Sequence, residues 1–391
     1  DSYDGRNKEP EVLPVKFPIL LYQGAEGIAV GLSTKILPHN FNEIIKSIIL
    51  YLKDKPFTLL PDFTTGGSID IDNYNRGARG GKVRVRADID VIDKNTLVIT
   101  SVPYGVTTTS LIDSIIKAND KNKIKIKNIE DNTSENVEII VNLVKGTSPD
   151  MTIDALYAFT NCEVSISPNC CVIIDNKPEF INVNKLLKYS VDHYMNIFRM
   201  ELEYDLNKLQ DKWHQQSLEI IFISNRIYRK IEDLSTWDLI ISTIEKSLEP
   251  FTKKLTRPTL EDDIARLTEL KIKRISKYDL DKAEQNIISI EKQIEEVQHN
   301  INNIVEYAIS YYDDLLSNYS LGKDRKTVVR KFDTISARTV AIANKKLYVN
   351  RKDGFIGFDL KSDEYVSECS ELDSVIVFLE NGTYIVSSIE S

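Results

Sequence analysis

The sequence has few cysteines, only four among 391 residues, and just two of them, Cys170 and Cys171, are adjacent. This number and spacing fit neither a disulfide framework nor the paired CxxC ligands of a zinc site. Reduced thiols in a cytoplasmic protein are therefore expected.

Long apolar runs are absent as well, and no stretch approaches the roughly 20 residues that cross a bilayer. Residues 1–8 lack the basic start and the apolar stretch of a secretory signal, and the chain does not begin with methionine. We expect no membrane segment and interpret Asp1 as a fragment boundary.

Motifs of self-contained catalysis are also missing. Residues 24–31 (GAEGIAVG) hold three glycines, which allow a ligand to approach the backbone closely. They lack the Gly-Lys-Ser/Thr ending of a phosphate-binding loop, so a packed structural turn is preferred to a nucleotide site. No serine or cysteine stands in a nucleophile elbow, and the histidines do not cluster. The sequence predicts no metal site.

Acidic residues outnumber basic ones, 59 to 50, and the formal net charge is −9. This excess argues against nucleic-acid binding, which lysine and arginine carry. Binding depends on the local electrostatic field, however, and acidic residues on a distant helical arm would leave a basic groove intact. Five cations fall within eleven residues, with no acid between them: Arg76, Arg79, Lys82, Arg84 and Arg86.

Strand periodicity orders part of this basic stretch. Side chains alternate along a strand, so Lys82, Arg84 and Arg86 share one face while Val83 and Val85 share the other. Such a row of cations can track a phosphate backbone. A solvated sheet face is the alternative, and the residues alone leave both open.

Ile28 and His39 are two further candidates. An apolar side chain such as Ile28 can wedge between base steps and kink a duplex, although the residues alone favour a core isoleucine. His39 stands just before a helix expected to start near Asn42, where a histidine ordinarily makes local hydrogen bonds.

The length predicts two to four structural units. The first 184 residues have an α+β pattern. Residues 82–91 and 96–102 form a probable hairpin, residues 110–118 a helix and residues 137–144 a buried strand.

From about residue 185 the pattern changes to long helices. One helix face gathers seven side chains: Leu187, Val191, Tyr194, Phe198, Leu202, Leu209 and Trp213. A later heptad seam steps by three and four: Leu280, Ala283, Ile287, Ile290, Ile294, Val297, Ile301, Ile304 and Ala308. We predict an outgoing arm, a globular tip and an antiparallel returning arm. Residues 334–391 predict β-hairpins, with turns at Asp353-Gly354 and Asn381-Gly382.

Several motifs together resemble the A subunits of bacterial type IIA DNA topoisomerases, gyrase and topoisomerase IV. In order along the chain they are residues 9–18 (EPEVLPVKFP), 24–31, 37–40 (LPHN), 80–86 (GGKVRVR), 102–106 (VPYGV), 129–131 (IED) and 267–275. The tail lacks the glycine-rich box of gyrase, which favours topoisomerase IV. The alternative is the corresponding chain of gyrase.

The resemblance implies an α+β fold with a tower of mixed helices and strands, a long antiparallel coiled coil with a helical tip, and a short all-β tail. The implied domains are a DNA-bending tower (1–184), an outgoing helix (185–226), an exit-gate dimerisation tip (227–278), a returning helix (279–318), and a linker with the start of a β-pinwheel (319–391).

The resemblance also implies part of an ATP-dependent topoisomerase that passes one duplex through a transient double-strand break in another, close to the nucleoid. The implied DNA-binding residues are Gly27, Ile28, His39, Arg76, Arg79, Lys82, Arg84 and Arg86. No tyrosine stands in the family's Arg-Tyr-Thr context, so we expect the nucleophile upstream of Asp1 and this chain alone to be inactive.

No cofactor is expected in the chain itself, because in this family Mg²⁺ and ATP bind through the partner B subunit. The other implied partners are double-stranded DNA and a second copy through the tip. One departure is Glu26, where relatives commonly have serine, because a carboxylate repels phosphates. Two rival interpretations are a structural coiled-coil protein of the chromosome-organising type and a nucleotide-dependent enzyme.

Overall fold

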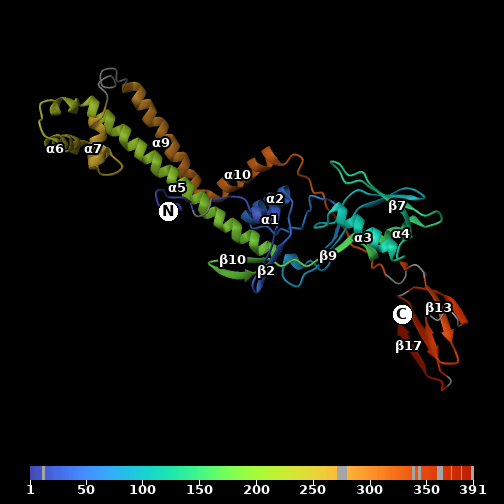
Figure 1. Cartoon of the computed structure of the whole chain (residues 1–391). Coiled ribbons are helices and arrows are strands. Elements are labelled where there is room, and N and C mark those ends of the chain that lie inside the picture. The colour runs from blue at the N-terminus through green and yellow to red at the C-terminus, as the bar shows by residue number, and fades with distance from the viewer. Residues whose placement is uncertain are drawn as a thin grey trace. The chain divides into compact units, whose positions relative to one another are not determined.

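The computed structural model of the chain describes residues 1–10, 14–270, 280–336, 340–341, 345–358, 364–370, 372–379 and 381–388 (Figure 1). Residue contacts divide the chain into two units. The arm unit contains Asp1–Phe17 and Tyr189–Ser317, and the sheet unit contains Pro18–Lys188 and Asn318–Ser391. The five domains predicted from the sequence divide the chain more finely and stay predictions.

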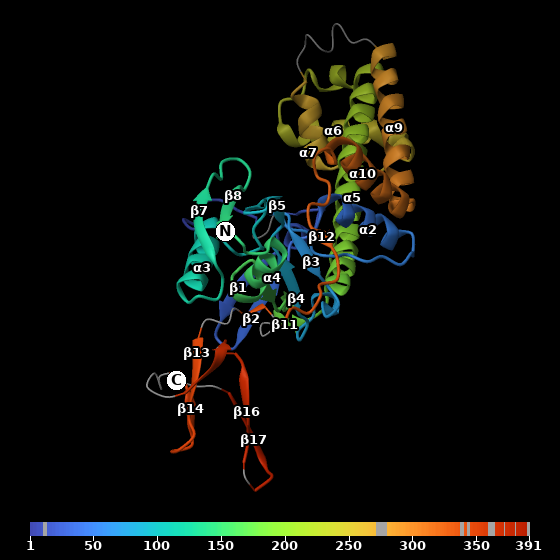
Figure 2. The ribbon, with the colours of Figure 1, turned by 90° about the vertical axis from the view of Figure 1, so that its right-hand side faces the viewer.

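The first sheet of the sheet unit is built around alternating valines. Its strands, in spatial order, are β12 (Val328–Val329), β3 (Ser68–Asp70), β4 (Val83–Arg86) and β9 (Glu163–Ile166). Val83 and Val85 are fully buried, beside Phe63 and Ile69. β12 pairs parallel to β3 although about 260 residues separate them in the sequence, and Figure 2 shows the two together.

The second sheet has the order β5 (Ile89–Asp93), β6 (Thr96–Ile99), β8 (Ile139–Leu143) and β7 (Ile126–Asp131). Helices α3 (Thr108–Asp120) and α4 (Pro149–Phe159) share its hydrophobic core. The predicted helix over 110–118 and strand over 137–144 are confirmed.

The predicted strand over residues 82–91 is wrong as a single element. The chain leaves the first sheet after Arg86, and β5 begins the second sheet at Ile89. Between them the Ala87 N–H donates to Cys162, and the Asp88 N–H donates to the Ser101 hydroxyl. The alternating pattern continues across this crossover, so periodicity alone did not reveal it.

Two short helices and two hairpins complete this part of the sheet unit. The elements are α1 (Ile19–Gln23), β1 (Ala25–Ala29), β2 (Leu32–Ile36), α2 (Phe41–Leu52), the 3₁₀ turn η1 (Asn75–Gly77), β10 (Cys171–Ile174) and β11 (Lys177–Phe180). The Asn40 side chain caps α2 by accepting from the Asn42 and Glu43 N–H groups, which satisfies donors left free at a helix start.

The tail consists of short antiparallel strands. They are β13 (Lys345–Asn350), β14 (Phe355–Gly357), β15 (Glu364–Cys369), β16 (Ser374–Phe378) and β17 (Tyr384–Ser388). Asp353-Gly354 joins β13 to β14 and Asn381-Gly382 joins β16 to β17, so both predicted turns are confirmed. All four cysteines are free within the described part of the chain.

The arm unit is dominated by α5, a helix of 42 residues (Val183–Ser224) that continues from the sheet unit. The later elements are η2 (Ile227–Ile231), α6 (Trp237–Leu248), η3 (Glu249–Lys254), α7 (Glu261–Thr268), α9 (Leu280–Asn302) and α10 (Ile304–Tyr319). Both views show α5 and α9 side by side, and the Trp213 indole donates to Glu291 at 3.0 Å between them (Figures 1 and 2).

The heptad seam lies on the less exposed side of α9, where Ile290 is buried. The predicted returning arm over 279–318 contains two helices, α9 and α10, which are separated at Asn303. At this residue the backbone N–H and the side-chain amide of Asn303 both donate to the His299 carbonyl, each at 2.9 Å. Seam spacing alone could not show the break.

The fold class is confirmed as α+β, with a long helix and a small all-β tail. Among the described residues, no helix is both long and apolar enough to span a bilayer. The part of the tip motif at residues 271–275 and residues 11–13 of the first motif lie outside the described residues.

Candidate nucleic-acid interface

Residues 24–36 form an antiparallel hairpin, which we call the wedge hairpin. β1 pairs with β2 from Ala25 opposite Ile36 to Ala29 opposite Leu32, leaving Val30-Gly31 as the turn (Figure 2). Gly24 holds the base of the hairpin at φ +73°, where an added Cβ would lie 2.6 Å from the Ile36 carbonyl oxygen. Glycine is required there because any side chain would collide with backbone. The glycine-rich segment is thus a projecting hairpin and not a packed turn.

Ile28 and Val30 are almost fully exposed on this hairpin, at 91% and 103%. The core interpretation of Ile28, which the residues alone favoured, is therefore wrong. Single exposed apolar side chains are common on protein surfaces, but two on one hairpin tip form a local apolar edge. Gly27 precedes them on an exposed stretch of β1, where the backbone is accessible.

The wedge hairpin is braced by Asn169. Backbone N–H groups of Lys35 and Asn169 donate to each other's carbonyls at 2.8 and 2.9 Å. The Asn169 side-chain amide also donates to the Ser33 carbonyl at 2.7 Å. The next residue, Cys170, donates from its N–H to the Gly77 carbonyl at 3.3 Å, which links this brace to the turn that carries Arg76.

The basic stretch begins with three exposed cations, Arg76, Arg79 and Lys82. Arg76 has left-handed backbone angles (φ 51°, ψ 34°) inside η1. The Arg79 guanidinium lies over the Phe180 ring of β11 at 5.5 Å from its centre. Within the described residues these three cations make no ion pair, so their charge faces solvent.

Arg84 and Arg86 are placed differently from the other cations of the stretch. They share one face of β4, as the alternation indicates, but Glu163 on β9 lies directly opposite Arg86. Arg84 donates to both Glu163 carboxylate oxygens at 2.7 and 3.0 Å, and Arg86 donates to one of them at 2.6 Å. The hydrogen bond to Glu163 raises the pKa of Arg84 above its usual value.

The segment after α10 covers these two arginines. Both guanidinium groups lie over the Phe332 ring, at 5.4 Å for Arg84 and 4.4 Å for Arg86. Arg86 also donates to the Asp333 carbonyl at 3.3 Å and is only 8% exposed. We call Arg84, Arg86, Glu163 and Phe332 the arginine cluster. Sequence reasoning missed Glu163 and Phe332, because neither has a local signal that reports its distant partners.

His39 is buried, with 2% of its surface exposed. Its Nδ1 lies 3.0 Å from the Leu21 carbonyl oxygen and its Nε2 lies 3.3 Å from the Tyr74 hydroxyl. Burial lowers the pKa of His39 to about 4, so the ring is neutral at physiological pH. The structure gives His39 the local hydrogen-bonding role, and a direct contact with DNA would require it to leave this site.

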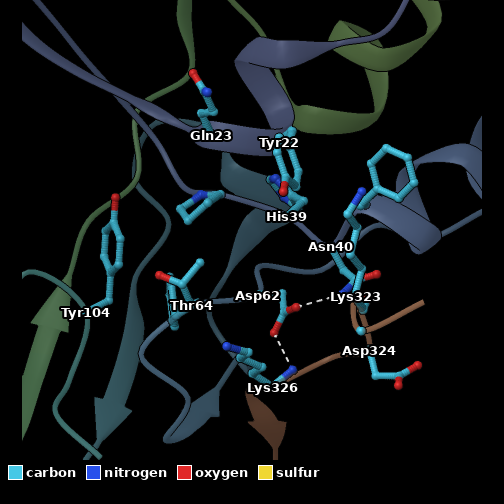
Figure 3. Close-up of a pocket in the computed structure, with 14 residues that line it drawn as sticks. Tyr22, Gln23, His39, Asn40, Asp62, Thr64, Tyr104, Lys323, Asp324 and Lys326 are labelled. Atoms are coloured by element: carbon cyan, nitrogen blue, oxygen red, sulfur yellow. Dashed lines mark hydrogen bonds between the residues drawn. The ribbon is translucent and has the colours of Figure 1, made fainter. Parts of the chain in front are cut away.

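A pocket of about 400 Å³ adjoins His39 in the sheet unit (Figure 3). Asp62 ties its walls together by accepting from the Asn40 amide at 2.9 Å and from the Lys326 N–H at 3.0 Å. Arg325, beside the pocket, makes a two-pronged ion pair with Glu43 on α2. These bonds fix the segment after α10 against α2. The same segment places Phe332 over Arg84 and Arg86.

Residues 1–314 of the chain match the family model that describes the A subunits of DNA gyrase and topoisomerase IV. The chain belongs to this family. The recognition from sequence motifs is thereby confirmed. Membership also sets aside the two rival interpretations, a structural coiled-coil protein and a nucleotide-dependent enzyme built on the glycine-rich segment.

The relatives of this A-subunit chain include both branches of the family. It is 39% identical over 389 residues to the A subunit of DNA topoisomerase 4 from Borreliella burgdorferi, covering 100% of this chain and 62% of that protein. It is 29% identical over 359 residues to the A subunit of DNA gyrase from Lawsonia intracellularis, covering 87% of this chain and 42% of that protein. The chain therefore spans less than two thirds of the length of these relatives.

Proposed function

We propose that the chain binds and bends a DNA duplex as part of a topoisomerase IV A subunit, with Ile28 as the wedge. The observation that best supports this proposal is the 91% exposure of Ile28 on a hairpin whose base is fixed by Gly24 and Asn169. An apolar side chain inserted between base steps unstacks them at a cost of about a few kcal/mol and kinks the duplex. A rigid hairpin can deliver such a side chain without bending away.

The exposed cations Arg76, Arg79 and Lys82 are proposed as phosphate contacts. The turn that carries Arg76 is linked to the hairpin through Cys170 and Asn169, so the two elements lie close together. Phosphate contacts fix the position of a duplex, while the wedge decides where it bends. Gly27 is proposed to allow close approach of the duplex to the backbone of β1.

Arg84, Arg86 and His39 also belong to the set predicted to contact DNA, and these contacts stay predictions. The charge of both arginines is already paired with Glu163, so each would have to exchange a carboxylate for a phosphate. We therefore expect these two arginines to contribute less to DNA affinity than the three exposed cations.

The rest of the assembly is proposed from the family. The chain would help to form the exit gate by pairing with a second copy through the tip, and a B subunit would supply the ATPase and the Mg²⁺ site. None of the tyrosines of this chain stands in an Arg-Tyr-Thr context, so strand cleavage is proposed to depend on a residue outside this sequence. The higher identity to a topoisomerase IV relative favours that enzyme, and gyrase is the alternative.

The test is fluorescence transfer across a doubly labelled duplex of about 30 base pairs, because DNA of this length is stiff and resists smooth bending. The unaltered chain is expected to raise transfer on binding, and Ile28→Ala to abolish that rise while the duplex stays bound. Ile288→Ala on α9, where the isoleucine is also exposed, is the matched control and should bend DNA normally. Normal bending by Ile28→Ala would refute the wedge, and no binding at low salt would refute DNA binding by this chain.

A further inference from the structure

The wedge hairpin carries an exposed ion pair that its folding does not require. Glu26 on β1 and Lys35 on β2 are direct cross-strand partners. The Lys35 ammonium Nζ lies 2.8 Å from Glu26 Oε1, and the side chains of Lys35 and Glu26 remain 34% and 61% exposed. Exposed ion pairs of this kind contribute about 0–1 kcal/mol to folding. The hairpin therefore does not depend on this pair for its stability.

The pair shares a face with the wedge. Side chains two residues apart on a strand point to the same side, so Glu26 and Ile28 lie on one face of β1. Their opposite partners, Lys35 and Ser33, lie on the same face of β2. Two residues along a strand correspond to about 7 Å. The charges thus stand next to the position at which Ile28 would enter a duplex.

Phosphates of a wedged duplex would come within range of both charges. Each DNA strand carries a phosphate about every 3.4 Å along the helix axis. The distance from Ile28 to the pair is shorter than the Debye length of about 10 Å at 0.1 M salt, so solvent ions screen it only partly. Lys35 would attract these phosphates and Glu26 would repel them.

We propose that Glu26 acts as an electrostatic restraint on the wedge hairpin, holding Lys35 in an ion pair so that it does not grip phosphate. This inference rests on the proposed DNA binding. The paired charges cancel, so the hairpin adds little non-specific affinity and its engagement depends on insertion of Ile28. Removing the carboxylate alone frees Lys35 as one additional phosphate contact.

Four proteins are compared, and the control variant given below separates a local effect on the hairpin from a change in the net charge of the chain. They are the unaltered chain, Glu26→Gln, Lys35→Gln and the double variant. Each phosphate neutralised by a protein cation steepens the dependence of log affinity on log salt by about 0.9. Glu26→Gln should steepen the slope by about that amount. The ratio of its DNA affinity to that of the unaltered chain should then rise about threefold when the salt is lowered from 200 to 50 mM.

The double variant should return to the behaviour of the unaltered chain, because it removes both charges. Lys35→Gln alone should bind more weakly than the unaltered chain, since it leaves an unpaired carboxylate facing phosphates. The expected order of affinity is therefore Glu26→Gln first, then the unaltered chain and the double variant together, then Lys35→Gln. Glu364→Gln is the matched control, because it removes a carboxylate of similar exposure, 57% against 61% for Glu26, from an ion pair with Arg351 in the tail.

Binding is measured by fluorescence anisotropy on the full chain at both salt concentrations, with circular dichroism to verify folding. The proposal is overturned if Glu26→Gln binds like the unaltered chain, if the gain survives in the double variant, or if Glu364→Gln gives the same gain. Bending by the unaltered chain in any of these cases would leave the proposed function standing. Absence of DNA binding by the unaltered chain would overturn both.

Discussion

The basic segment of the sheet unit, residues 76–86, begins at a turn that is linked to the wedge hairpin and ends at the arginine cluster, and the charges of these two regions are arranged in opposite ways. Arg76, Arg79 and Lys82 near the hairpin are exposed. Arg84 and Arg86, a few residues later, are enclosed by Glu163 and an aromatic ring. The same residue type therefore serves two different purposes within eleven residues.

The difference arises from the neighbours that the fold supplies. β4 lies between β3 and β9 in the first sheet, so its side chains meet residues from both neighbouring strands. The exposed cations precede β4 and belong to a turn with few neighbours. A cation in a sheet interior requires a partner charge, whereas a cation in a turn remains available to a ligand.

Glu163→Ala should cause the largest loss of stability. It leaves the buried Arg86 guanidinium without its Glu163 partner and leaves Arg84 with Asp70 at 3.9 Å, and breaking a buried pair by removing one partner costs about 3–5 kcal/mol. Urea unfolding followed by circular dichroism measures the change. Glu26→Gln on the wedge hairpin, which also breaks an ion pair, should cost less than about 1 kcal/mol. Equal losses for the two variants would remove the distinction between the regions.

The buried His39 should make the stability of the fold depend on pH. Its pKa falls from an ordinary 6.5 in the unfolded chain to about 4 in the folded one, because burial disfavours the charged ring. The folded state binds fewer protons between these values, so the contribution of His39 is complete above pH 6.5 and is lost as the pH falls towards 4. The loss amounts to about 3 kcal/mol over that window.

The measurement for His39 is the free energy of unfolding at several pH values for the unaltered chain and His39→Gln. The variant should be less stable at pH 7, and the gap should narrow as the pH falls towards 4. A gap that stays constant would show that the ring is not held neutral. The exposed His193, substituted in the same way, serves as the control for replacing a histidine outside the core.

Asn169→Ala should affect the wedge hairpin without affecting the arginine cluster. The substitution removes the side-chain bond to the Ser33 carbonyl, which is worth about 1 kcal/mol, and keeps the backbone bonds to Lys35. We expect a small loss of stability and a smaller DNA bend at nearly unchanged affinity, because a looser hairpin delivers Ile28 less firmly. The fluorescence-transfer assay reports the bend, and an unchanged bend would mean that the backbone bonds alone suffice.

Local sequence signals predicted the elements that depend on local structure. The helix over 110–118, the strand over 137–144 and the turns of the tail were all recognised from periodicity and turn residues, and the family from its motifs. The crossover at residues 87–88 was missed because alternation continues from one sheet into the next. The break at Asn303 was missed because the apolar seam continues through it from α9 into α10.

The candidate site was predictable in composition but not in exposure. The sequence singled out Ile28 and the basic stretch, yet it favoured a buried Ile28, which is exposed, and an open row at Arg84 and Arg86, which are paired. Exposure depends on contacts between residues far apart in the chain. Glu163 lies about 80 residues from its arginines and Phe332 about 250, and no spacing rule reaches across such intervals.

Lys82→Ala and Arg84→Ala provide the most direct comparison, because the two residues are two positions apart but differ in their surroundings: Lys82 precedes β4 and is exposed, whereas Arg84 lies in β4 and is paired with Glu163. Lys82→Ala should weaken DNA binding and reduce the salt slope by about 0.9, the value for one phosphate contact, with little change in stability. Arg84→Ala should instead lower stability, since it leaves Glu163 with a single arginine, and change the salt slope less. Anisotropy titrations at several salt concentrations and urea unfolding on the same samples separate the two effects. If Arg84→Ala reduces the slope as much as Lys82→Ala, then phosphate displaces Glu163 on binding, and the arginine cluster belongs to the DNA interface after all.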